Sequence, residues 1–336
     1  MSRTRDPYWD SLKFSLMCMV VYIHTLVAYD RIPGTVTLGL FNFCYYFTMP
    51  LFTFVSGRFS QIGSKKKYFW GIIGLLETYF LFQVVQIYEK DCLIGNEAFR
   101  PSKLILMVEW TLWYLPALAV WRIATWCIPK HVLASRPKVV LATSFVISLL
   151  VCFIPVKKYS IFIHTFALMP YFYLGYYSNK ADIRKKMELI PFGVALLIIL
   201  SIVLLFCTNF NQILSYYFEY GFTYWACRGP SVLYNFGFRI FHFMTAMIIG
   251  LLWMRIIPGN NSIVSKWGQG TLFIYMFHPV ILLLLKECNH RNWLPNNPWW
   301  SLLSAAIIVV GLGVLSRFKW MKIILSPITY WVRKRF

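Results

Sequence analysis

Long runs of apolar residues constrain this chain more than any other feature of its sequence. The segments 104–127, 189–207 and 301–316 each carry at most one or two charged residues. A helix needs about 20 apolar residues to cross roughly 30 Å of hydrocarbon. The runs therefore predict a protein that crosses a membrane several times.

The composition excludes other classes of protein. Of 336 residues, 59% are hydrophobic and 13% are charged, whereas soluble domains are about 45–50% apolar and about 25% charged. An ordinary soluble enzyme and a disordered protein are thus excluded. The net charge of +21 could suggest a nucleic-acid binder. However, the basic residues lie in short clusters between apolar runs, as in loops at a membrane surface, so no nucleic-acid partner is expected.

We expect an all-α membrane bundle, because backbone polar groups in lipid must be satisfied within a segment and no alternating barrel pattern is present. Lys13 and His24 interrupt or end the first apolar run, and a small-residue cleavage site is lacking, so this run is read as a helix rather than a signal peptide. A single transmembrane domain over residues 1–336 is predicted. Its ten helices are expected at about 11–29, 36–57, 68–87, 104–127, 138–155, 161–177, 189–208, 234–254, 270–286 and 299–316.

The distribution of Lys and Arg predicts the orientation. Of the 33 basic residues, 23 fall on the side of the N-terminus and Arg239 falls within a span. Because the side richer in Lys and Arg is normally cytoplasmic, both termini are predicted to be cytoplasmic. The other nine basic residues are Arg31, Lys90, Arg100, Lys103, Lys157, Lys158, Arg228, Lys286 and Arg291.

Two features of the predicted outer side remain open. The chain has eight cysteines without a CxxC pair or a Cys/His spacing typical of zinc, so no metal is expected. Cys92, Cys227 and Cys288 fall in outer connections, where a disulfide between two of them is possible. The aromatic connection 209–233 is expected to lie on the membrane interface or to fold back into the bundle, where it could cover a site.

Ionisable residues inside the predicted spans point to a site, because each costs roughly 2.5–3.5 kcal/mol to insert. The first helix carries Asp10, Lys13 and His24. Lys13 and His24 are eleven residues apart, close to three helical turns, so they share one face about 16 Å apart. The simpler alternatives are a lysine that snorkels to the interface and a histidine that hydrogen-bonds a neighbouring helix.

Four further ionisable residues lie in later spans. Glu77 is in the third helix, His278 is in the ninth, and Arg239 and His242 share a face of the eighth. A neutral imidazole can take a proton from an attacking hydroxyl. No phosphate loop, HExxH motif or nucleophile elbow is present. An enzyme, a transporter or flippase for a glycolipid or anionic solute, and a sensor whose histidines only pack helices all remain open, although the repeated halves typical of many transporters are not seen.

Several segments together resemble the acyltransferase-3 family of integral membrane acyltransferases, in particular its fucose 4-O-acetylase-like branch. The first is Asp10-Ser-Leu-Lys13 followed, after ten residues, by His24. Arg239 and Pro258 also fall where the family has an arginine in the eighth helix and a proline after it. The other matching segments, in order, are 49–59 with Ser56 and Gly57, 112–118 with Trp113, 169–177, and 268–279 with Tyr275 and His278.

The resemblance implies ten core helices and transfer of an acetyl group from cytoplasmic acetyl-CoA to a hydroxyl of a glycan or lipid-linked sugar. It also implies that the protein lies in the bacterial cytoplasmic membrane, in contact with membrane lipid, and that it acts in the cell envelope. By this resemblance His24 is the catalytic histidine. Lys13 stands where many members have arginine, Lys65, Lys66 and Lys67 replace an arginine pair, and Glu77 stands where a neutral residue is expected.

Together with the resemblance, charge suggests how acetyl-CoA would bind. Its phosphates should stay near Lys13, Arg58 and the lysines of 65–67, while the pantetheine arm extends toward His24. His24 would then either deprotonate the acceptor hydroxyl or carry the acetyl group itself. Ser56 and Gly57 would shape the channel. Tyr275 and His278 would orient His24, bind the acceptor or pack helices.

Overall fold

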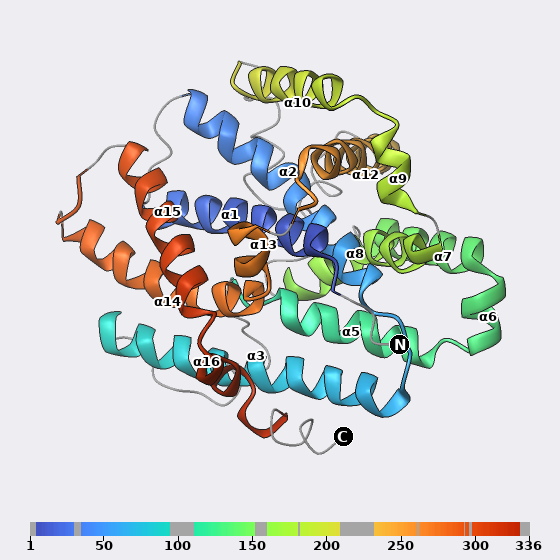
Figure 1. Cartoon of the computed structure of the whole chain (residues 1–336), viewed down its shortest axis with the longest axis horizontal. Helices are drawn as coiled ribbons and strands as arrows, with labels where there is room; N and C mark the ends of the chain where they lie inside the picture. The colour runs from blue at the N-terminus through green and yellow to red at the C-terminus, as the bar shows by residue number, and fades with distance from the viewer. Residues whose placement is uncertain are drawn as a thin grey trace. The chain divides into compact units, whose positions relative to one another are not determined.

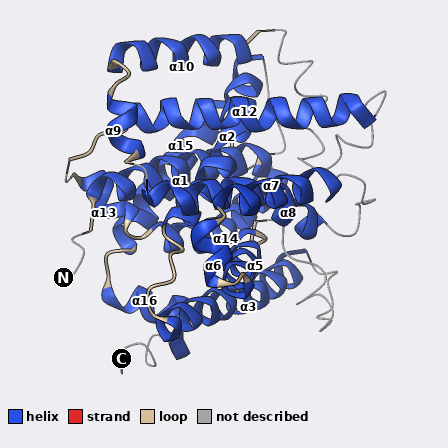
Figure 2. Ribbon diagram, turned by 90° about the vertical axis from the view of Figure 1, so that its right-hand side faces the viewer, coloured by secondary structure: helices blue, strands red, loops and turns tan. Residues whose placement is uncertain are grey.

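A computed structural model describes residues 5–29, 35–94, 111–151, 160–180, 182–208, 232–260, 262–291, 293–295 and 298–329. Every regular element in these ranges is a helix (Figure 2), which confirms the all-α prediction. The chain divides into two compact units. Unit 1 comprises Met1–Gly34, Gly63–Pro116 and Ile257–Phe336, and unit 2 comprises Thr35–Ile62 and Ala117–Ile256.

Unit 1 is built around the first helix, α1 (Pro7–Ala28). Asp6 caps it by accepting a 3.0 Å hydrogen bond from the backbone N–H of Tyr8, and Pro7 occupies the first turn, where no N–H is needed. α1 packs on α13 (Ile263–Gly268), α14 (Thr271–His290) and α15 (Pro298–Leu315). α14 also contacts α3 (Lys65–Ile94) and α16 (Lys319–Leu325) (Figure 1).

Unit 2 is organised by the pair α2 (Thr35–Arg58) and α8 (Ser160–Tyr177). A Cβ added at Gly57 would overlap the carbonyl oxygen of Phe172, and one at Gly175 would overlap that of Phe54. The two backbones therefore touch, as small residues permit between membrane helices. The other elements of the unit are α5 (Tyr114–Cys127, from Ala117 onward), α6 (Lys130–Ser135), α7 (Pro137–Leu150), η2 (Ser178–Lys180), α9 (Ile183–Glu188), α10 (Phe192–Phe206) and α12 (Val232–Ile256).

Five of the described helices are long and apolar enough to cross a membrane: Pro7–Ala28, Val36–Arg58, Lys65–Leu93, Phe236–Ile256 and Thr271–His290. Shorter apolar helices cover Pro137–Leu150, Phe192–Phe206 and Trp299–Leu315. Each of the ten predicted segments overlaps a helix, although α3 is longer than predicted. The first residues of the predicted helix 104–127, at 104–110, and the last residues of the predicted helix 138–155, at 152–155, lie outside the described residues. Residues 111–113 form a turn before α5.

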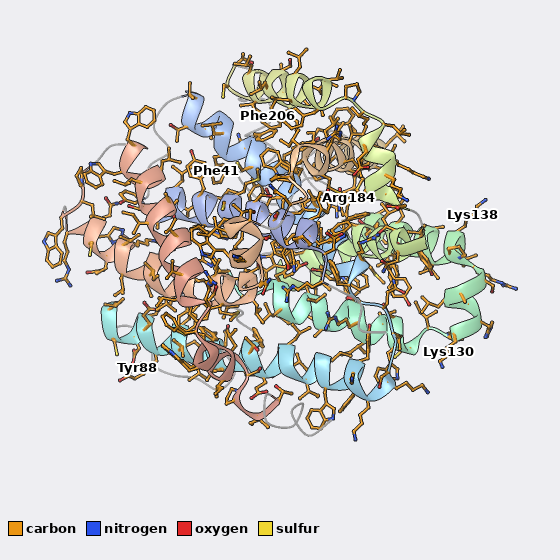
Figure 3. All side chains as sticks on the ribbon, in the orientation of Figure 1. Phe41, Tyr88, Lys130, Lys138, Arg184 and Phe206 are labelled. Atoms are coloured by element: carbon orange, nitrogen blue, oxygen red, sulfur yellow. The ribbon has the colours of Figure 1, made fainter. Side chains whose placement is uncertain are left out.

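Side chains fit a bundle that faces lipid. Buried threonines such as Thr25, Thr78 and Thr125 donate to the carbonyl four residues earlier, so their hydroxyls need no water. Large apolar side chains are exposed, as at Leu204 of α10. Figure 3 shows Lys130 and Lys138, both exposed, directed away from the neighbouring helices. Cys92 and Cys288 are free thiols, whereas Cys227 and most of the connection 209–233 lie outside the described residues.

Candidate active site

Two histidines meet inside unit 1. The rings of His24 on α1 and His278 on α14 are stacked, with centroids 5.5 Å apart and planes inclined by 30°. His278 is fully buried and His24 is half-buried. α1 is continuous from Pro7 to Ala28, so Lys13 and His24 lie on one unbroken helix, and their place on one face of it stays a prediction. The structure thus places His278, one of the candidates named from the sequence, directly beside His24.

Two residues of α14, His278 and Tyr275, make hydrogen bonds at the histidine pair. Nδ1 of His278 lies 3.1 Å from the carbonyl oxygen of Ile274 on the same helix. The hydroxyl of Tyr275 donates to the carbonyl oxygen of Thr111, and its ring lies 5.9 Å from that of His278. The Tyr275 ring also meets Tyr114 edge to face. Tyr275 therefore ties α14 to the turn before α5.

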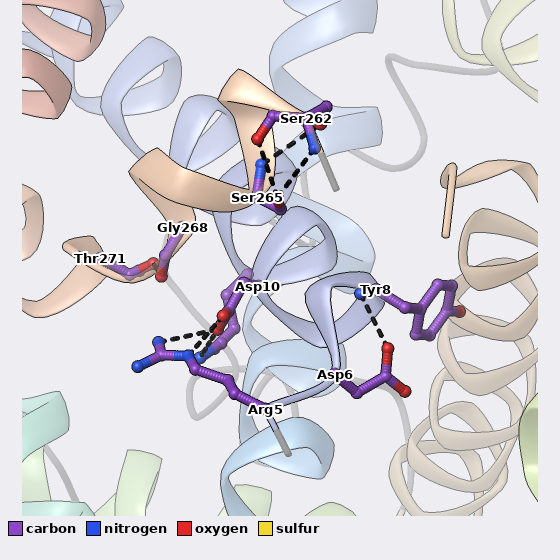
Figure 4. A network of polar contacts seen from close by, with 9 residues as sticks. Arg5, Asp6, Tyr8, Asp10, Ser262, Ser265, Gly268 and Thr271 are labelled. Atoms are coloured by element: carbon purple, nitrogen blue, oxygen red, sulfur yellow. Dashed lines mark hydrogen bonds and ion pairs between the residues drawn. The ribbon is translucent and has the colours of Figure 1, made fainter. Parts of the chain in front are cut away.

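Arg5, Asp10 and Lys13 meet at the start of α1, and Figure 4 shows the pair of Arg5 and Asp10. Asp10 is buried, and its carboxylate accepts from Nε of Arg5 at 2.5 Å and from Nη2 of Arg5 at 2.9 Å. Nζ of Lys13 lies 2.7 Å from Oδ1 of the same carboxylate. Charge-assisted hydrogen bonds of this kind fix side-chain direction. Asp10 therefore positions Lys13, and the three residues together keep one positive charge.

The short helix α13 lies directly on this group. A Cβ at Gly268 would overlap the carbonyl oxygen of Asp10, so only glycine allows the two backbones to meet here. The hydroxyl of Thr271 donates to the carbonyl of Gly268 at 2.6 Å and links α13 to α14. Ser262 and Ser265 form a capping box at the start of α13 (Figure 4). The segment 268–279 thus connects the neighbourhood of Asp10 to His278.

Glu77 has partners that the sequence does not reveal. Its carboxylate accepts from the backbone N–H of Ile328 at 2.6 Å and from that of Thr329 at 3.0 Å. The hydroxyl of Thr329 also donates to it. The carboxylate therefore holds the C-terminal segment, which explains how a charged residue is accommodated on α3.

The other candidate site residues of unit 1 lie at the start of α3 and in the turn before α5. Lys65, Lys66 and Lys67 form the exposed first turn of α3. Trp113 is half-buried in the turn before α5, with its ring 5.7 Å from that of Tyr114. Contact of these residues with acetyl-CoA stays a prediction.

In unit 2, Arg58, Ser56 and Gly57 lie at the end of α2. Nη1 of Arg58 donates to the carbonyl of Ser178 at 2.9 Å and thereby joins the end of α2 to the start of η2, directly after α8. The carbonyl of Ser56 accepts from the hydroxyl of Ser60 at 2.7 Å. With the backbone contact at Gly57, these bonds give the end of α2 a packing role. A role of Arg58 toward acetyl-CoA is a separate prediction.

Arg239 and His242 of α12 also belong to unit 2 and are buried. Nη2 of Arg239 lies 3.5 Å from the hydroxyl of Ser148, and Nε2 of His242 lies 3.1 Å from the carbonyl oxygen of Tyr46. The hydroxyl of Tyr46 in turn lies 2.5 Å from that of Thr245. These contacts connect α12 to α2 and α7.

Sequence reasoning missed Arg5, Thr111 and the packing role of Gly268. Arg5 lies five residues before Asp10, so the charge pattern contains a signal for this pair. Gly268 lies in the segment 268–279, which carries part of the family resemblance. The reason for a glycine at this position is visible only in the structure, where α13 meets α1. Thr111 contributes a backbone carbonyl, and no side-chain pattern reveals that role.

The fold and the stacked histidine pair indicate a helical membrane protein with an imidazole site. Comparison with known families then gives the class: the model of the acyltransferase-3 family, described as an acyltransferase domain, matches residues 6–317. The chain belongs to this family. No curated protein and no solved structure matches the chain.

Proposed function

We propose that the protein is a membrane O-acyltransferase that transfers an acetyl group from cytoplasmic acetyl-CoA to a hydroxyl of a cell-envelope glycan or lipid-linked sugar. Membership of the acyltransferase-3 family supports acyl transfer. The observation that carries the site assignment is the place of His24, which stacks on the buried imidazole of His278 and shares a helix with Lys13. The fucose 4-O-acetylase-like branch and the bacterial cytoplasmic membrane are part of the same proposal.

In the proposed reaction His24 is the general base. A ring nitrogen of His24 accepts the proton of the acceptor hydroxyl as the hydroxyl oxygen attacks the thioester carbonyl carbon. The carbon–sulfur bond then breaks, and the CoA thiolate takes the proton back from the imidazolium. Lys13, held by Asp10, supplies positive charge near the start of α1 for the CoA phosphates.

The test is acetyl transfer by the full chain in membranes with acetyl-CoA, together with mass spectrometry of envelope glycans for an added acetyl mass. We expect His24→Ala to lower transfer by about 10²- to 10⁴-fold, the usual contribution of a general base. Val27→Ala on the same helix is the matched control, because Val27 is exposed. Transfer at the unmodified rate by the His24→Ala protein, at equal abundance in the membrane, would reject the assignment.

A further inference from the structure

Nε2 of His278 is a buried hydrogen-bond acceptor that the described residues leave without a partner. A carbonyl oxygen can only accept, so the 3.1 Å bond to Ile274 requires the hydrogen on Nδ1. In the neutral ring, Nε2 then presents a lone pair. The side chain is fully buried, so water does not satisfy this lone pair at the protein surface. A buried polar atom without a partner requires an explanation, and a bound ligand is one.

The place of this lone pair suggests which ligand group it binds. The His278 ring is stacked on that of His24 with 5.5 Å between centroids, so a ligand group bound at one ring lies next to the other ring. A lone pair needs an N–H or O–H donor. Two hydroxyls on neighbouring carbons of a sugar are spaced so that each can reach one of two stacked rings.

We infer that the acyl acceptor carries two hydroxyls on neighbouring carbons, one acylated beside His24 and the other donating a hydrogen bond to Nε2 of His278. This inference rests on the proposed function and names the acceptor class within it. The second hydroxyl keeps its proton throughout, since the only proton moved is the one that His24 accepts. His278 is therefore an acceptor-binding residue that selects the substrate.

A hydrogen bond from the acceptor gives the buried acceptor atom beside the proposed base a function. A site that hydrogen-bonds a substrate hydroxyl rejects the analogue lacking it by up to about 10⁴–10⁵-fold, because the buried partner is then left unsatisfied. Such a site favours a diol of the sugar type over a simple alcohol.

The first test needs no variant. The acetylated product from membranes of the unmodified protein is isolated, and tandem mass spectrometry and NMR locate its acetyl group. We expect the carbon next to the acetylated one to carry a free hydroxyl. An acetyl group whose neighbouring carbons carry no free hydroxyl overturns the inference and leaves acyl transfer standing, whereas the absence of any acetylated product overturns both.

The second test compares variants on that acceptor. His278→Phe keeps a ring against His24 but removes the lone pair, and His278→Gln restores an acceptor oxygen. For His278→Phe we expect kcat/KM for the acceptor to fall on the order of 10- to 100-fold, with the KM for acetyl-CoA unchanged. His278→Gln should recover part of this loss. The control is Leu284→Ala, an exposed position on the same helix.

Three results would contradict the inference. A raised KM for acetyl-CoA alone would show that His278 binds the pantetheine amide. A fall in kcat well beyond about 100-fold and equal to that of His24→Ala would make His278 the base. Equal activity of the His278→Phe and unmodified proteins would show that the nitrogen binds nothing in the reaction.

Discussion

At the scale of single residues, Lys13 is held inside the bundle rather than extended along the surface. Its Nζ lies 2.7 Å from Asp10, and its side chain is only 23% exposed. The partner lies three residues away on the same helix, so this pair follows from the sequence spacing alone. The buried carboxylate also binds Arg5, so removing Lys13 leaves Asp10 with a cation.

We expect Lys13→Ala to raise the KM for acetyl-CoA about 10- to 100-fold, because the proposed charge-assisted bond from Lys13 to a CoA phosphate would be lost. Lys13→Arg keeps the charge and should retain more activity. Lys130→Ala, which removes an exposed cation of α6, is the control. The measurement is initial rate against acetyl-CoA concentration in membranes, and equal rates for the alanine, arginine and unmodified proteins would remove Lys13 from the site.

Contacts between distant residues cannot be predicted in the same way. The sequence identifies His24 and His278 as ionisable residues within spans, but their stacking depends on how α1 packs against α14. Likewise Glu77 is unusual in the sequence, while its partners at residues 328 and 329 belong to the far end of the chain. Sequence spacing within one helix therefore predicts only contacts between residues that are a few positions apart.

At the scale of elements, helix contacts depend on glycines at particular places. The α2–α8 and α1–α13 contacts both require a missing side chain, at Gly57 and Gly175 and at Gly268. The apolar pattern predicts which segments are helices, since it reports hydrophobicity. It does not predict which helices touch, and it misses the short helices α6, α9, α13 and α16, whose six or seven residues carry no long apolar run.

Gly57→Ala tests the contact between α2 and α8. The added methyl group would overlap the Phe172 carbonyl, so the helices must separate, and we expect a loss of stability of roughly 1–3 kcal/mol or more. The matched control is Gly311→Ala on α15, where an added Cβ meets nothing within 4 Å. There we expect no loss, and a gain of up to about 1 kcal/mol from helix propensity. Thermal unfolding in detergent measures both, and equal melting temperatures would contradict the close contact.

At the scale of the whole molecule, the number of spans decides where the termini lie. Five helices meet the length and hydropathy requirements, and an odd number of spans would place the termini on opposite sides. The predicted ten would place them on the same side. The difference depends on helices such as α7, α10 and α15, which have 14, 15 and 18 residues. At about 1.5 Å per residue the shortest spans only about 21 Å, so it would need locally thinned lipid or adjoining residues to cross.

Fusions at the two ends therefore test the topology directly. The excess of Lys and Arg predicts that both termini are cytoplasmic. We expect green fluorescent protein, which fluoresces when fused on the cytoplasmic side, to be bright at either terminus. Alkaline phosphatase, which is active only outside, should be inactive at the C-terminus and active when fused after Pro295 in the predicted outer connection. An active phosphatase at the C-terminus together with a bright N-terminal fusion would mean an odd number of spans, so that at least one of the ten predicted segments does not cross the membrane.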